Sequence, residues 1–169
     1  MANTYQLIEA KTLSTGTNSI SFTSIPQTYT DLNLLISVRA STSAELYLSI
    51  NNNVGSGYRT LSMNGSAPSS FGFALYQTAK AYLGEAEYST MTADTFASAS
   101  VYLPKYTGST KKTLQTESGQ TSQTGASLYW YINGSIYNST SAIDNLQVYI
   151  SAGNMIAGST FYLYGIKNS

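Results

Sequence analysis

Short runs in which apolar and polar residues alternate recur along the whole chain. The clearest run covers residues 31–39, where Leu32, Leu34, Ile36 and Val38 would share one face of an extended strand. Similar runs lie at 5–10, 18–23, 45–50, 58–63, 71–76, 97–103, 111–116, 128–132, 146–150 and 160–166. The pattern predicts an all-β protein of about ten strands.

Alternation also predicts which side chains face the core and which face outward. The positions expected to point inward in the later runs are Leu46, Leu48, Ile50, Ala97, Ala99, Val101, Leu103, Leu128, Trp130, Ile132, Leu146, Val148, Ile150, Phe161 and Leu163. The positions opposite them are rich in tyrosine, namely Tyr47, Tyr102, Tyr129, Tyr131, Tyr149, Tyr162 and Tyr164. Half-exposed tyrosine is common in strands, but it is also enriched at protein interfaces. We therefore predict that these seven residues form an interface, with subunit contacts favoured over stacking against sugar rings.

Turn and helix signals are few. The dipeptide Asn133-Gly134 separates residues 129–132 from 135–137, and Asn-Gly is the preferred centre of a type I′ hairpin turn. This dipeptide therefore predicts a tight hairpin.

One segment departs from alternation. Leu75, Ala79, Leu83 and Ala86 have helical spacing, although Gly84 interrupts it. We expect a loop or at most one short helix there.

The order of these elements limits the architecture. No β-α-β alternation and no repeat of fixed length is present, and one-sided strands bury their apolar faces most simply between two packed sheets. The prediction is a two-sheet antiparallel β-sandwich, similar to a jelly roll. With 169 residues, the chain is expected to form a single domain over 1–169, in which 1–13 serve as an N-terminal arm or an edge strand.

The composition argues against several kinds of binding partner. The chain contains no His and no Cys, only 9% of its residues are charged, and its formal net charge is zero. No positive field exists to attract nucleic acid, and no apolar run approaches the ~18 residues of a membrane span. We expect no nucleic-acid partner, no membrane partner, no metal and no cofactor.

Catalysis lacks its usual groups as well. A hydroxyl nucleophile would need a base, and no His is available. Glu85 and Glu87 could in principle act as the paired carboxylates of a glycosidase, but two carboxylates in a polar segment are more often solvated. We predict that the protein is not an enzyme and has no catalytic residues.

Three segments resemble small virion proteins of tailed bacteriophages. They are Ser24-Ile25-Pro26-Gln27-Thr28-Tyr29-Thr30-Asp31-Leu32, Val101-Tyr102-Leu103-Pro104-Lys105-Tyr106-Thr107-Gly108-Ser109-Thr110-Lys111-Lys112 and Phe161-Tyr162-Leu163-Tyr164-Gly165-Ile166-Lys167. The similarity covers most of the chain, and residues 64–94 match no part of it.

The resemblance implies a jelly-roll decoration or cement protein on the capsid surface of the virion. Such a protein would bind between capsomers, contact the major capsid protein and stabilise the head, commonly as a homotrimer. The alternative is a receptor-binding or carbohydrate-binding module of a tail fibre or baseplate, with a host glycan as its partner. Aromatic residues gathered on one concave face would favour the alternative, whereas the tyrosines here are spread over at least five predicted strands.

Overall fold

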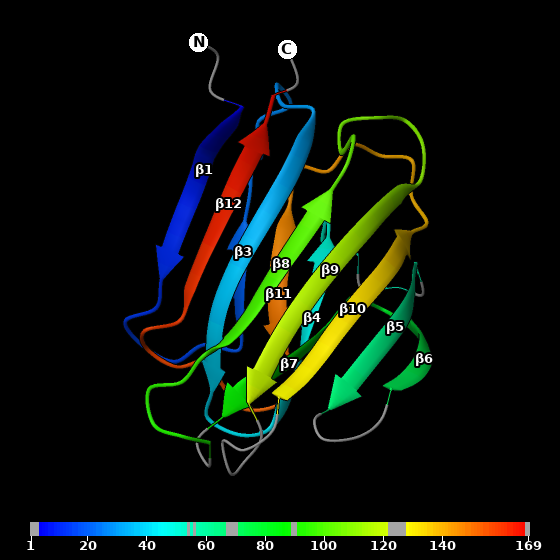
Figure 1. The fold of residues 1–169 in the computed structure, drawn as a ribbon. Coiled ribbons are helices and arrows are strands. Elements are labelled where there is room, and N and C mark those ends of the chain that lie inside the picture. Colours follow the sequence, from blue (N-terminus) through cyan, green and yellow to red (C-terminus); the bar gives the residue numbers. More distant parts are fainter. Residues whose placement is uncertain are drawn as a thin grey trace.

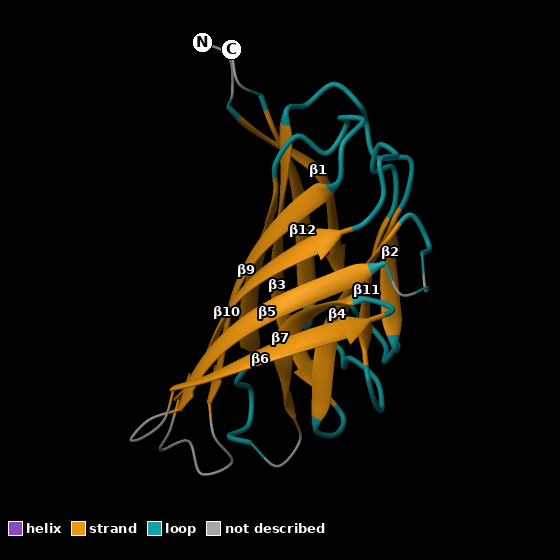
Figure 2. Cartoon of the chain, turned by 90° about the vertical axis from the view of Figure 1, so that its right-hand side faces the viewer, coloured by secondary structure: helices purple, strands orange, loops and turns teal. Residues whose placement is uncertain are grey.

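The computed structural model describes residues 4–53, 55, 57–66, 71–88, 91–121 and 128–167, and the regular structure within them is entirely β (Figure 2). The twelve strands among these residues are β1 (Tyr5–Thr12), β2 (Ser19–Phe22), β3 (Asp31–Ala40), β4 (Ala44–Ile50), β5 (Tyr58–Ser66), β6 (Phe71–Thr78), β7 (Ala81–Tyr88), β8 (Ala97–Leu103), β9 (Lys112–Thr121), β10 (Leu128–Tyr137), β11 (Leu146–Ile150) and β12 (Thr160–Ile166). The all-β prediction is confirmed.

The strands lie in two layers. The larger sheet has the order β1-β12-β3-β8-β9-β10-β5-β6, and the smaller sheet, behind it in Figure 1, has the order β2-β11-β4-β7. The strand pairs within each sheet are antiparallel, and a short parallel pairing of Arg39 with Glu87 and of Ala40 with Tyr88 connects β3 to β7. The expected antiparallel β-sandwich is therefore confirmed. The N-terminal strand β1 pairs with β12 at one edge of the larger sheet, and residues 1–3 lie outside the described part.

Apolar side chains from both sheets fill the space between β3, β8 and β12 on one side and β4 and β11 on the other. Leu34, Val101 and Leu163 come from the larger sheet, Leu48 and Val148 from the smaller, and none of them is exposed to solvent. In these strands the inward positions are those that alternation predicts. Burial of aliphatic surface is the main source of stability here, since each such side chain contributes about 1.5–3 kcal/mol when it is fully buried.

The segment with helical spacing is a correction to the sequence prediction, because it forms strands β6 and β7 rather than a helix or loop. In the β4–β7 pair, Leu46 lies opposite Gly84 and Tyr47 opposite Tyr82, so Leu83 is an extra residue in β7. Gly84 has a φ of +129°, a conformation that favours glycine. This β-bulge shifts the alternation of β7 by one residue, which is why its sequence does not have a strand period.

The predicted hairpin at Asn133-Gly134 is also wrong, because β10 runs without interruption from Leu128 to Tyr137. Asn133 pairs with Ser62 of β5 and Thr116 of β9, and Gly134 pairs with the next residues along both neighbours. A strand that is paired on both sides satisfies the backbone groups of this dipeptide throughout. Local turn preference is therefore overridden by the tertiary pairing of β10.

Candidate functional site

The alternation of β10 is reversed relative to the sequence prediction. Trp130 and Ile132, expected in the core, are 42% and 37% exposed, and Leu128 is also exposed. Tyr131, expected outside, is only 5% exposed and faces the smaller sheet, where its ring meets that of Tyr82 edge to face at 5.9 Å. The sequence identified the two faces of this strand correctly but assigned them to the wrong sides.

An apolar surface results on the outer side of the larger sheet. We define the outer patch as the exposed apolar residues of β5 and β10, which are Leu61, Leu128, Trp130, Ile132 and Ile136. Leu61 and Ile136 are 56% and 46% exposed. Contiguous apolar patches of this kind on soluble proteins mark sites of interaction. The outer patch is the candidate functional site.

The register of β9, β10 and β5 defines the shape of the outer patch. Ile132 lies between Glu117 of β9 and Met63 of β5, and Ile136 lies between Thr113 and Arg59. Gly134 lies on β10 between Ile132 and Ile136. It leaves the centre of the surface open, because a methyl group added there would meet nothing within 4 Å.

A distinct feature lies near each end of the outer patch. The ring of Trp130 lies over Gly119 of β9, where a methyl group on the glycine would come within 2.8 Å of the indole. At the other end, a depression of about 260 Å³ is lined by Gly57, Arg59, Lys111, Ile136 and Asn138. The site is therefore an apolar strip with a cationic hollow at one end.

The inner side of the same strands is polar because it covers strand β7. Ser118 of β9 donates a hydrogen bond of 2.7 Å to the carbonyl oxygen of Leu83, the extra residue of the bulge. The side-chain amide of Asn133 donates to the carbonyl oxygen of Tyr82 at 3.3 Å. A buried carbonyl without a partner is unfavourable by about 1–3 kcal/mol, so polar side chains are required at these inward positions. The apolar side chains of β10 must then face outward.

The two carboxylates considered as a catalytic pair lie at the same boundary. Glu85 Oε2 accepts a hydrogen bond of 2.5 Å from the side-chain amide of Gln120. Glu87 is completely buried and accepts hydrogen bonds from the hydroxyls of Thr95 and Thr121 and from the backbone N–H of Thr121. Both carboxylates thus hold β7 and β9 together, a structural use of these groups.

Three side chains in one row of this polar interior carry an atom without a hydrogen-bond partner. Ser62 of β5, Asn133 of β10 and Thr116 of β9 are paired in register, and the unpartnered atoms are Ser62 Oγ, Asn133 Oδ1 and Thr116 Oγ1. By contrast, the hydroxyls of Thr60 and Ser135 in the next row bond to each other at 2.7 Å.

The structure distributes the seven predicted interface tyrosines over four places. Tyr102, Tyr162 and Tyr164 lie on the outer side of the larger sheet, on β8 and β12, which both flank β3. Tyr47 and Tyr149 are paired across β4 and β11 in the smaller sheet. Tyr129 is exposed at the start of β10, and Tyr131 is in the interior. They therefore do not form one continuous surface.

One of these tyrosines is committed to an internal contact. The hydroxyl of Tyr102 donates to Asp31 Oδ2 at 2.9 Å, and Asp31 Oδ1 accepts from the backbone N–H of Lys105 at 2.8 Å. The hydrogen bond to Asp31, followed by partial burial, raises the pKa of Tyr102. This arrangement fixes the turn after β8.

The described residues contain no group of three or more acidic side chains that could hold a metal ion. They also include no helix with the length and apolar character needed to span a bilayer. No protein-family model, curated protein or solved structure matches the chain.

Proposed function

We propose that this protein is a structural component of a virus particle, of the decoration or cement type, and that its copies bind one another through the outer patch. The outer patch is the single observation that carries the assembly role, since five large apolar side chains lie exposed on two adjacent strands. The resemblance of three segments to small virion proteins of tailed bacteriophages supports a place on the capsid surface. The major capsid protein is the proposed partner of the assembled copies, and the proposal includes no enzymatic activity.

A second copy of the chain is the occupant that the outer patch favours. Glu117 and Arg59, both exposed, lie diagonally across β10 from each other, with Gly134 midway between them. A two-fold axis that lies between two facing sheets, passes over Gly134 and is perpendicular to the line from Arg59 to Glu117 brings Arg59 of each copy to Glu117 of the other. Two-fold interfaces are self-complementary in this way.

The zero net charge of the chain also favours a second copy as the partner of the outer patch. The chain has a formal net charge of zero, so copies do not repel one another as strongly charged proteins do. The apolar residues between Arg59 and Glu117 would leave water on association, which is favourable by about 25 cal/mol per Å² of apolar surface buried.

The number of copies follows from the type of contact. Two outer patches that face each other give a dimer, whereas the homotrimer expected from the resemblance requires each patch to meet a different surface of the next copy. The two assemblies have twice and three times the 18.1 kDa mass of the chain, so light scattering separates them.

A charge exchange tests the assembly role. Arg59→Glu and Glu117→Arg are each expected to weaken self-association about tenfold or more, because like charges would then meet across the interface. The double variant is expected to restore association. Lys167→Glu, which makes the same change of charge at an exposed residue just after β12, on the far side of β3, is the control and should associate like the natural chain. Failure of the double variant to restore association would overturn the proposed pairing.

The virion role has its own test. Capsids of the parent virus prepared without this protein are mixed with the purified chain, and the capsids are collected by sedimentation. The proposal predicts saturable binding and an increase in the temperature at which the capsids release their DNA. Absence of binding to the capsids would contradict the decoration role, whatever the state of self-association.

A further inference from the structure

The outer side of the smaller sheet carries a second site, unrelated to the outer patch. Tyr149 of β11 and Tyr47 of β4 lie next to each other across the two strands, and Tyr82 of β7, which is buried against Tyr131 of β10, lies on the other side of Tyr47. The rings of Tyr47 and Tyr82 meet edge to face, with centroids 5.8 Å apart. An aromatic row of this kind is apolar along its ring faces and polar at its hydroxyls.

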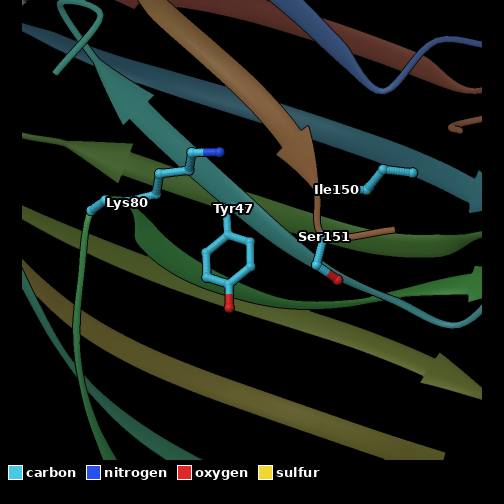
Figure 3. A pocket seen from close by; sticks show the side chains of 5 residues that line it. Tyr47, Lys80, Ile150 and Ser151 are labelled. Atoms are coloured by element: carbon cyan, nitrogen blue, oxygen red, sulfur yellow. The ribbon is translucent and has the colours of Figure 1, made fainter. Parts of the chain in front are cut away.

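Hydrogen bonds hold two of these rings along their own strands. The hydroxyl of Tyr47 donates to Glu45 Oε2 at 2.6 Å, and the hydroxyl of Tyr149 donates to Gln147 Oε1. In both strands the acceptor is two residues earlier and on the same face, so each ring tilts along the sheet. Figure 3 shows the ring of Tyr47 broadside. A ring fixed in this way offers a flat apolar surface at little further loss of conformational entropy.

A depression surrounds the ring of Tyr47. Its volume is about 320 Å³, and it is lined by Tyr47, Ala79, Lys80, Ile150 and Ser151. Lys80 comes from the turn between β6 and β7, while Ser151 directly follows β11, and their side chains lie on either side of the ring (Figure 3). The volume is at the small end of the ~300–1,000 Å³ range of ligand pockets, which suits a single sugar ring.

Two hydrogen-bond donors stand at the rim of this depression. The ammonium group of Lys80 lies 3.6 Å from the centroid of the Tyr149 ring, an arrangement in which the cation is attracted to the ring face. Ser151 Oγ accepts a hydrogen bond of 2.9 Å from the backbone N–H of Glu45 and keeps its own proton for donation. The depression thus combines an apolar ring face with a positive charge and a hydroxyl donor.

We propose that this depression binds a pyranose ring that carries a carboxylate, such as a hexuronic acid unit of an acidic polysaccharide. One face of a pyranose consists of C–H groups that pack on an aromatic ring, and its edge carries acceptors for donors such as Ser151. The carboxylate pairs with the ammonium group of Lys80, which gives the site its preference for an acidic sugar. This inference is independent of the proposed function, because it uses residues of the other sheet.

The test is a titration of the full chain, followed by NMR, with a trisaccharide of galacturonic acid and with the neutral galactose trisaccharide of the same linkage. We expect binding of the acidic sugar with a dissociation constant of about 1 mM, and clearly weaker binding of the neutral one. Binding of both sugars with equal affinity, or of neither at tens of millimolar, would overturn the inference.

Variants locate the binding site. Lys80→Met is expected to weaken binding of the acidic trisaccharide about tenfold and to leave that of the neutral sugar unchanged. Lys111→Met, which removes the same charge just before β9 of the other sheet, is the matched control and should change neither. Tyr47→Ala should abolish binding of both sugars, and Tyr47→Phe, which keeps the ring, should retain it. Loss of binding in Lys111→Met equal to that in Lys80→Met would place the sugar elsewhere.

Discussion

The interior of the sandwich is aliphatic in one region and polar in another. Between β3, β8 and β12 on one side and β4 and β11 on the other, the interior is aliphatic and the outer faces carry polar residues and tyrosines. Between β5, β9 and β10 and strand β7, the interior contains Ser62, Thr116, Ser118, Gln120 and Asn133, and the outer face carries the outer patch. The same alternating pattern therefore gives a core in one region and an interaction surface in the other.

The difference comes from what each region has to cover. The first region faces the surface of a sheet, where backbone groups are already paired and apolar side chains pack best. The second covers the bulged edge strand β7, whose carbonyl groups at Tyr82 and Leu83 receive side-chain donors. Because the carbonyl groups of β7 need hydrogen-bond donors, the polar faces of β9 and β10 point inward. The apolar face of β10 then points outward, where a partner can cover it.

The largest effect is expected in the aliphatic region. Leu48→Ala removes a completely buried side chain of the core and should lower the free energy of unfolding by about 2–5 kcal/mol. Denaturation with guanidinium chloride measures this change. A loss below 1 kcal/mol would mean that the first region does not dominate the stability.

A smaller loss of stability is expected when the β-bulge of β7 is disturbed. A methyl group on Gly84 would lie 2.1 Å from Ser118 Oγ, and the residue would be strained at a φ of +129°. Gly84→Ala should therefore lower the free energy of unfolding by about 2 kcal/mol or more. Gly134→Ala, at an open position of a continuous strand, is the control and should be neutral or slightly stabilising, by up to about 1 kcal/mol. Equal losses would show that the bulge has no special role.

A matched pair of serines sharpens the comparison within the polar interior. Ser135→Ala leaves the hydroxyl of Thr60 without its partner and should lower the free energy of unfolding by about 1–3 kcal/mol. Ser62→Ala removes a buried hydroxyl that has no partner and should change it by less than about 0.5 kcal/mol. Thermal or chemical denaturation of both variants provides the test. The reverse order would contradict the hydrogen bonding described for this interior.

The core is also expected to lose stability at high pH. Burial raises the pKa of Tyr58, whose hydroxyl accepts a 2.7 Å hydrogen bond from the backbone N–H of Ile50. The folded state keeps this phenol protonated at a pH where the unfolded chain ionises. The stabilising contribution is complete below the ordinary pKa of 10.0 and is lost as pH rises above it, by up to about 1.4 kcal/mol per pH unit. Tyr58→Phe should reduce this loss in alkaline unfolding curves, and an unchanged slope would contradict it.

The sequence predicts the fold class and most strands, because the aliphatic positions of β3, β4, β8, β11 and β12 alternate without interruption. It misses β7, since the extra residue Leu83 shifts the period, and it divides β10 at Asn133-Gly134 because the pairing with both neighbours is not visible locally. The outer patch was missed for a different reason. Alternation separates two faces but does not tell which one meets the other sheet, and at β10 that depends on the backbone groups of β7.

The most direct test of the outer patch is the mass of the protein in solution, measured by light scattering over a wide range of concentration. We predict that the chain exceeds its monomer mass of 18.1 kDa at high concentration and that Ile132→Lys remains at that mass. Leu7→Lys, at an exposed apolar residue of β1 on the far edge of the same sheet, should associate like the natural chain. A natural chain that stays monomeric at every concentration, or an Ile132→Lys variant that associates equally well, would contradict the account.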